Sequence, residues 1–141
     1  MELSRGEKLF YEAFIQWEKN FWKNINPEKK DFGNNIQPHY IFSGQQLDFF
    51  YTIECYDNPY TKIKICIEII EEDREPMSPA TKRFLLLNGI HVVGFTYDEL
   101  VRDADKCIKS FRDIAVELFK TVDNCIFYVL WPAAREGRNI T

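Results

Sequence analysis

Apolar positions near the start of the chain follow a helical spacing. Between Glu2 and Lys23, large apolar side chains recur at steps of three and four residues, the period of an amphipathic helix. Ser4 followed three positions later by Glu7 matches a capping box. The pattern therefore predicts a helix that begins near Ser4, and the polar stretch from Asn24 to Asn35 predicts a connector after it.

Three segments with strand character follow this helix. Each is rich in aromatic or β-branched residues, which favour a pleated strand. In the third segment, isoleucines fill every second position, so Lys64, Cys66 and Glu68 share the opposite face. The predicted strands are His39–Ser43, Gln46–Ile53 and Lys62–Glu71, with a turn over Tyr56–Tyr60.

The second half of the chain alternates helices and strands. Ser78 is a predicted helix N-cap and Gly89 the residue that ends the same helix. The nearly all-apolar run Ile90–Phe95 predicts a strand at the centre of a sheet that is covered on both faces. Thr96 and Glu99 form a second capping box ahead of a long apolar stripe. The remaining predicted elements are a helix from Thr96 to Phe119, a strand over Cys125–Trp131 and a polar tail.

The order of these elements predicts the fold class. A helix, three strands, a helix, a strand, a helix and a strand indicate one α/β domain with a mixed sheet flanked by helices. We expect this domain to span residues 1–141, with residues 132–141 as a flexible tail.

Composition and charge narrow the classes of function. The chain has 45% hydrophobic residues and a formal net charge of −4, which excludes a broad basic surface for nucleic acid but leaves a local patch open. Its four cysteines lack the spacing of a zinc site, so we expect most of them to be small buried hydrophobes. No apolar run is long enough to span a membrane, and we expect a soluble cytoplasmic protein.

Two acids lie within predicted strands, Asp48 and Glu68. If the second and third strands pair as a hairpin, both carboxylates converge on one end of the sheet. Converging carboxylates bind Mg²⁺, which can activate water and stabilise charge on a phosphate. The alternative is structural, with Asp48 capping a turn or pairing with a lysine, and Glu68 pairing with Lys64, Lys62 or Lys82.

The order and spacing of several short segments resemble the PD-(D/E)XK nuclease superfamily, and within it the branch related to very short patch repair endonucleases. The similar segments carry an acid in the first helix, an acid in each of two strands, and a helix that leads into an apolar strand with a final threonine. They are Gly6–Phe10, Gln37, Leu47–Phe49, Ile67–Ile69, Lys82–Asn88 and Gly89–Thr96.

This resemblance implies a restriction-endonuclease-like fold and metal-dependent hydrolysis of phosphodiester bonds in DNA. It implies that Asp48 and Glu68 hold Mg²⁺, with Mn²⁺ as a substitute, that Glu7 is an accessory acid near the metal, and that Gln37 is a polar support.

The chain departs from the superfamily at two positions. Ile70 stands where the superfamily has its lysine, and Gly94 stands where an arginine is common. Lys64 and Lys82 are the candidate substitutes for the missing cation. Two functions therefore stay open: a metal-dependent endonuclease, or a catalytically degenerate relative that binds nucleic acid or a protein partner.

Overall fold

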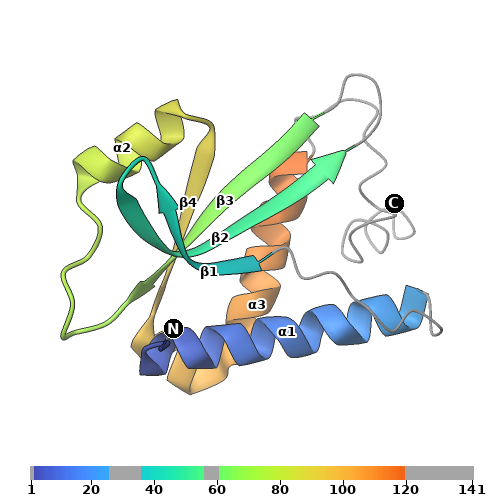
Figure 1. Cartoon of the computed structure of the whole chain (residues 1–141). Helices are drawn as coiled ribbons and strands as arrows, with labels where there is room; N and C mark the ends of the chain where they lie inside the picture. The colour runs from blue at the N-terminus through green and yellow to red at the C-terminus, as the bar shows by residue number, and fades with distance from the viewer. Residues whose placement is uncertain (1, 26–35, 56–60, 120–141) are drawn as a thin grey trace.

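The protein is an α/β structure in which helices cover both faces of a mixed four-stranded sheet (Figure 1). A computed structural model describes residues 2–25, 36–55 and 61–119. The α/β class predicted from the sequence is therefore confirmed. The elements are α1 (Arg5–Ile25), β1 (Ile36–Phe42), β2 (Gln45–Cys55), β3 (Thr61–Ile70), α2 (Pro79–Leu87), β4 (Ile90–Thr96) and α3 (Tyr97–Phe119).

The strands lie in the order β1-β2-β3-β4. β1 pairs antiparallel with β2 and β2 antiparallel with β3, whereas β3 and β4 are parallel and joined through α2. Ser43 and Gly44 have φ of 51° and 81° and connect the paired residues Phe42 and Gln45. Two consecutive positive φ values are the geometry of the two-residue hairpin turn whose twist matches that of the strands.

β4 lies at one end of the sheet formed by the described residues, and its predicted central position stays a prediction because the predicted strand over residues 125–131 lies outside them. Both of its faces are covered, as its apolar composition predicted. Ile90 packs in the apolar cluster beneath α2, while Val93 and Phe95 pack in the cluster beneath α1 and α3.

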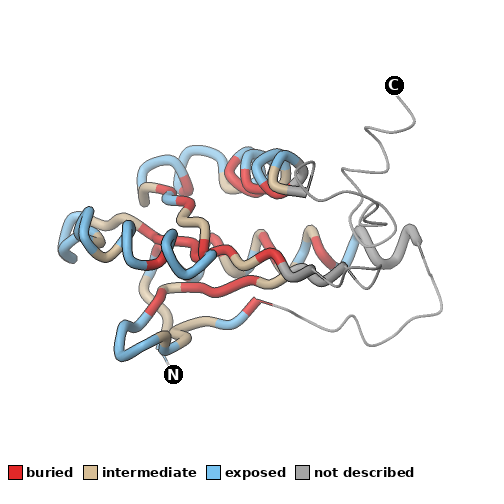
Figure 2. Tube along the Cα trace, turned by 90° about the horizontal axis from the view of Figure 1, so that it is seen from above, coloured by how far each residue is buried: buried red, intermediate tan, exposed pale blue. Residues whose placement is uncertain are grey.

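Two apolar clusters hold the layers together. The larger lies between the sheet and α1 and α3 and includes all four isoleucines at alternate positions of β3, which confirms the predicted face. The smaller lies between the sheet and α2 and includes Cys66, Phe50 and Leu85. Seen from above, the buried positions follow the sheet and the inner sides of the helices (Figure 2).

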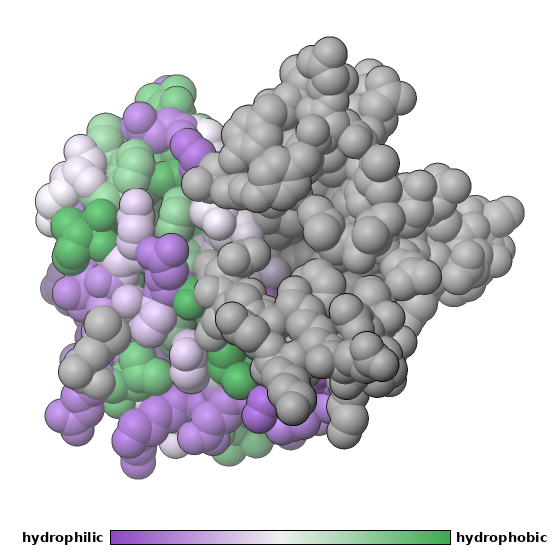
Figure 3. Space-filling view, turned by 45° about the vertical axis from the view of Figure 1, so that its right-hand side comes forward, coloured by the Kyte–Doolittle hydropathy of each residue, from purple (hydrophilic) through white to green (hydrophobic). Residues whose placement is uncertain are grey.

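The helix ends follow the predicted signals. The Ser4 hydroxyl accepts a hydrogen bond from the Glu7 amide, and Glu7 accepts one from the Ser4 amide, as a capping box requires. Ser78 caps α2, and Thr96 with Glu99 caps α3. The outward side of α1 forms a hydrophilic row along the lower edge of Figure 3.

α3 consists of two helical segments joined at a kink. Asp103 has φ of −164° and ψ of 89°, and its side chain accepts a hydrogen bond from the Lys106 amide. Asp103 therefore starts a new helical segment in the way an N-cap does, which the continuous apolar stripe of the sequence did not indicate.

Several sequence predictions lie outside the described residues. These are the turn over residues 56–60, the strand over residues 125–131 and the tail, and the single-domain boundary stays a prediction. Cys66 and Cys107 are buried free thiols, as expected. No helix among the described residues has the length and apolarity to cross a membrane.

Candidate functional site

Asp48 and Glu68 lie side by side on neighbouring strands. β2 and β3 pair in an antiparallel register whose last pair is Phe49 with Ile67, so the next step places Asp48 opposite Glu68. Asp48 Oδ2 accepts a hydrogen bond of 2.8 Å from the Ile69 amide. At the end of the β2–β3 pairing, the Ile69 amide therefore donates to the side chain of Asp48 in place of a backbone carbonyl group. The hairpin pairing on which the predicted acid pair depends is present.

Glu7 reaches the same end of the sheet from the first turn of α1. Its side chain is 1% exposed, and its Oε1 lies 3.0 Å from His39 Nε2 in β1. His39 has φ of 53°, a left-handed conformation that costs a non-glycine residue about 1–3 kcal/mol. In β1, His39 lies between the residues that pair with Phe49 and Leu47, and so it lies opposite Asp48. The residue that contacts Glu7 therefore has a strained backbone.

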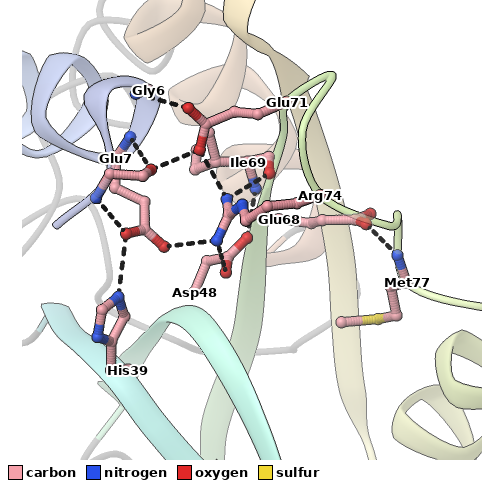
Figure 4. A network of polar contacts seen from close by, with 10 residues as sticks. Gly6, Glu7, His39, Asp48, Glu68, Ile69, Glu71, Arg74 and Met77 are labelled. Atoms are coloured by element: carbon pink, nitrogen blue, oxygen red, sulfur yellow. Dashed lines mark hydrogen bonds and ion pairs between the residues drawn. The ribbon is translucent and has the colours of Figure 1, made fainter.

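Arg74 lies at the centre of this group (Figure 4). Its Nη1 is 3.4 Å from both Glu7 Oε2 and Asp48 Oδ1. Its Nη2 is 2.9 Å from both Glu71 Oε2 and the Ile69 carbonyl oxygen. One guanidinium therefore connects α1, β2 and the end of β3.

Glu71 joins this guanidinium to the start of α1. Its carboxylate accepts hydrogen bonds from the Ser4 hydroxyl and from the Gly6 amide. A Cβ added to Gly6 would lie 3.1 Å from this carboxylate and 2.8 Å from Ile69. The glycine is therefore what permits the close approach of α1 to the end of β3.

The carboxylate of Glu68 points toward Met77 rather than into the group around Arg74 (Figure 4). It accepts a hydrogen bond from the Met77 amide, and its Oε1 lies 3.6 Å from Lys82 Nζ. Glu68 is only 4% exposed, and Oε1 has no hydrogen-bond partner among the described residues. A buried carboxylate oxygen without such a partner is costly, which marks this atom as an open ligand position.

The site carries an excess of negative charge. Four carboxylates share it with two full cations, while His39 adds a positive charge only when its ring is protonated. With a neutral imidazole, the formal excess of this network is two negative charges, and Glu75, which lines the cleft beside it, adds a further carboxylate. The carboxylates are those of Glu7, Asp48, Glu68 and Glu71, and the cations are Arg74 and Lys82.

Burial and charge shift the pKa values in opposite directions. Burial raises the pKa of Asp48 to about 6, and nearby Glu7 adds to the rise, although the Ile69 amide and Arg74 oppose it. Burial also raises the pKa of Glu7, but the Ser4 amide, His39 and Arg74 outweigh it and hold that pKa below its ordinary value. Asp48 and Glu7, although neighbours, are therefore shifted in opposite directions by burial and by their different partners.

A cleft of about 320 Å³ opens beside these acids. Its walls come from the β1–β2 hairpin and from the N-terminal turn of α2, and its floor from the ends of β2 and β3. The polar residues lining it include Gln45, Gln46, Asp48, Glu68, Arg74, Ser78 and Thr81. Asp48 and Glu68 thus face one common, mostly polar space.

The structure brings together most of the predicted site residues. Glu7, Asp48 and Glu68 lie at one end of the sheet, and Lys82 pairs with Glu68. Lys64 is not among them. It pairs in the sheet with Thr52 and Ile90, four residues before Glu68 and about 13 Å away along the strand.

Gln37 likewise lies apart from the acids, as an exposed residue of β1. Within the described residues, Lys64 and Gln37 are therefore outside the network of ion pairs and hydrogen bonds at the site.

Arg74 and His39 are residues of the site that the sequence pattern did not indicate. Arg74 is the single cation within the acidic run Glu71–Glu75, which is the one signal that sets it apart. His39 carries no comparable signal, because its left-handed conformation is visible only in the structure.

The donors present fit a magnesium ion, which is commonly held by one or two protein carboxylates with water completing its shell. Asp48 and Glu68 line one cleft, and Glu68 Oε1 lacks a hydrogen bond. No three His, Cys, Asp or Glu side chains among the described residues are already grouped around a metal position.

No protein-family model, curated protein or solved structure matches the chain.

Proposed function

We propose that this protein is a metal-dependent, nuclease-like phosphodiesterase that acts on DNA, with a restriction-endonuclease-like arrangement of its sheet. The observation that carries the proposal is the position of Asp48 and Glu68, opposite each other where the β2–β3 ladder ends and on one polar cleft. Glu7 from α1 reaches the same place, as the resemblance seen in the sequence implies.

Asp48 and Glu68 would hold Mg²⁺, with Glu7 close by. When bound, the ion supplies charge stabilisation to a phosphate and activates water. The chain's own residues orient these donors. The Ile69 amide fixes Asp48 Oδ2, the Met77 amide fixes one oxygen of Glu68, and His39 fixes Glu7.

Lys82 is the lysine that we propose to contact a bound phosphate. It lies beside the cleft, whose lining includes Arg74 but not Lys82. Its Nζ is 3.6 Å from Glu68 Oε1, and its side chain is 45% exposed. It would supply the positive charge that is absent at Ile70.

Cleavage of plasmid DNA with millimolar Mg²⁺ or Mn²⁺ tests this function. Asp48→Asn and Glu68→Gln should each lower the nicking rate by about a hundredfold or more, because each removes a charged metal donor. Glu72→Gln is the matched control, since Glu72 is exposed in the loop after β3 and lies outside the network. The proposal fails if purified wild-type protein nicks no DNA, or if the Asp48 and Glu68 variants nick as fast as wild type.

Two observations favour a second function. Arg74 already satisfies Asp48 and Glu7, and Ile70 replaces the superfamily lysine, with its Cδ1 only 3.3 Å from a Cβ placed on Gly94. This is the arrangement expected of a degenerate relative that binds without hydrolysis. It predicts chelator-insensitive binding of labelled DNA or of a protein partner, together with no metal-dependent cleavage.

A further inference from the structure

Arg74 and a divalent cation would both bind the carboxylate of Asp48. Oδ2 accepts a hydrogen bond of 2.8 Å from the Ile69 amide, which leaves Oδ1 as the oxygen more open to a cation. Oδ1 faces Arg74 Nη1 at 3.4 Å. A magnesium ion sits about 2.1 Å from its oxygen ligands, so an ion bound to Oδ1 would lie close to the guanidinium and repel it.

The four contacts of the guanidinium are unequal. The two made by Nη2, to Glu71 and to the Ile69 carbonyl, are 2.9 Å long, whereas the two made by Nη1, to Glu7 and Asp48, are 3.4 Å. Hydrogen bonds from N–H groups to oxygen are commonly about 2.9–3.0 Å. The guanidinium is therefore held firmly at its outer nitrogen and loosely at the nitrogen that faces the metal ligands.

Arg74 also has room to leave. Its side chain is 36% exposed and lines the cleft, and it lies between β3 and α2 in a segment without helix or strand. Turning the guanidinium into the cleft breaks no backbone hydrogen bond of the sheet or of a helix.

We infer that Arg74 is an internal inhibitor of the metal site, a guanidinium that occupies the cation position at Asp48 until a divalent metal ion displaces it. This inference rests on the proposed function. The hold on Arg74 comes mainly from Glu71, which is itself bonded to Ser4 and Gly6. The first turn of α1 therefore sets how readily the site opens.

Calorimetric titration with Mn²⁺ tests the inference on four proteins: wild type, Arg74→Gln, Arg74→Lys, and Arg74→Gln combined with Asp48→Asn. We expect Arg74→Gln to bind Mn²⁺ about tenfold more tightly than wild type, which corresponds to about 1.4 kcal/mol. Arg74→Lys should stay close to wild type, because it keeps the competing charge. The double variant should lose the gain. Arg83→Ala, which removes an exposed arginine of α2, is the matched control and should bind as wild type does.

The outcomes separate the two proposals. If wild type and Arg74→Gln bind Mn²⁺ with equal affinity, and this binding depends on Asp48, the inference that Arg74 inhibits the site is wrong and the proposed metal site stands. Asp48-independent binding, or no binding by any of the proteins, overturns both.

A measurement on wild type alone covers the case in which Arg74→Gln does not fold. Modification by an arginine-selective dicarbonyl reagent, followed residue by residue with mass spectrometry, should proceed several-fold faster at Arg74 when Mn²⁺ is added. Arg83 should react at an unchanged rate. A rate at Arg74 that is unchanged or lower with metal contradicts displacement.

Discussion

Asp48 is the residue at which burial and charge compete most directly. Its carboxyl group is held between an amide and a guanidinium, and burial raises its pKa to about 6. The folded protein therefore keeps a proton on Asp48 over a pH range in which an unfolded aspartate, with an ordinary pKa of 3.8, has lost it.

This difference predicts a pH dependence of stability. Between about pH 4 and pH 6 the folded state binds more protons at Asp48 than the unfolded state does, so the contribution of Asp48 to the free energy of unfolding falls as pH rises. Asp48→Asn should remove this fall. Urea unfolding of both proteins from pH 4 to pH 7 should show the variant gaining stability relative to wild type across that range. A constant difference between the two would contradict the raised pKa.

Single residues of the site differ in how far sequence could predict them. The capping role of Glu7 follows from its spacing to Ser4, whereas its place among the acids was implied only by the family resemblance, because the spacing does not show that this residue also faces Arg74. The role of Arg74 could not be predicted, because it depends on the path of the irregular segment that follows β3. His39 depends on a backbone angle that its residue type does not specify.

Among the elements, α2 depends on the backbone freedom of the residue that follows it. Gly89 has φ of 77°, and no heavy atom lies within 4 Å of a Cβ added there. Gly89→Ala should therefore lower the free energy of unfolding by about 1 kcal/mol through backbone strain alone.

Gly94→Ala is the matched control in the adjacent strand. Gly94 is outside the left-handed region, and the added Cβ would meet the flexible end of Ile70 at 3.3 Å and lie at ordinary contact distance, 3.7 Å, from Glu68 Oε1. Chemical denaturation should show little change for this variant. A loss equal to that of Gly89→Ala would exclude the left-handed conformation as the cause.

Most elements followed from local pattern, but their arrangement did not. Alternation in β3 and three capping signals gave the faces and starts of the elements, since these depend on neighbours in sequence. The position of β4 at the end of the described sheet depends on pairing between distant segments. Its apolar run indicates only that both faces of β4 are covered. This is also true of a strand at the end of the described sheet when helices cover each face.

At the scale of the whole molecule, Phe111 joins α3 to α1 and to the sheet. It is fully buried, and its ring lies 5.7 Å from the rings of Phe14 and Tyr51 and 6.3 Å from that of Phe10. Phe111→Ala should lower the free energy of unfolding by about 3–5 kcal/mol, because it leaves a cavity between three elements.

Ile114→Ala, three residues further along α3, is the control for helix propensity and side-chain loss. Ile114 is 37% exposed, so its loss should cost about 1 kcal/mol or less. Denaturant unfolding monitored by circular dichroism compares the two. Similar losses would contradict the packing of α3 through Phe111.

The network around Arg74 joins parts of the chain that are far apart in sequence. Glu7 and Arg74, like Ser4 and Glu71, are separated by 67 positions. Contacts of this range must overcome the entropy of closing a long loop before they contribute any stability. The docking of α1 on the end of β3 therefore brings Glu7 to Arg74 and the start of α1 to Glu71. The repulsion between Glu7 and the acids at the end of the sheet is then offset by Arg74, which lies three residues after Glu71 and pairs with both Glu7 and Glu71.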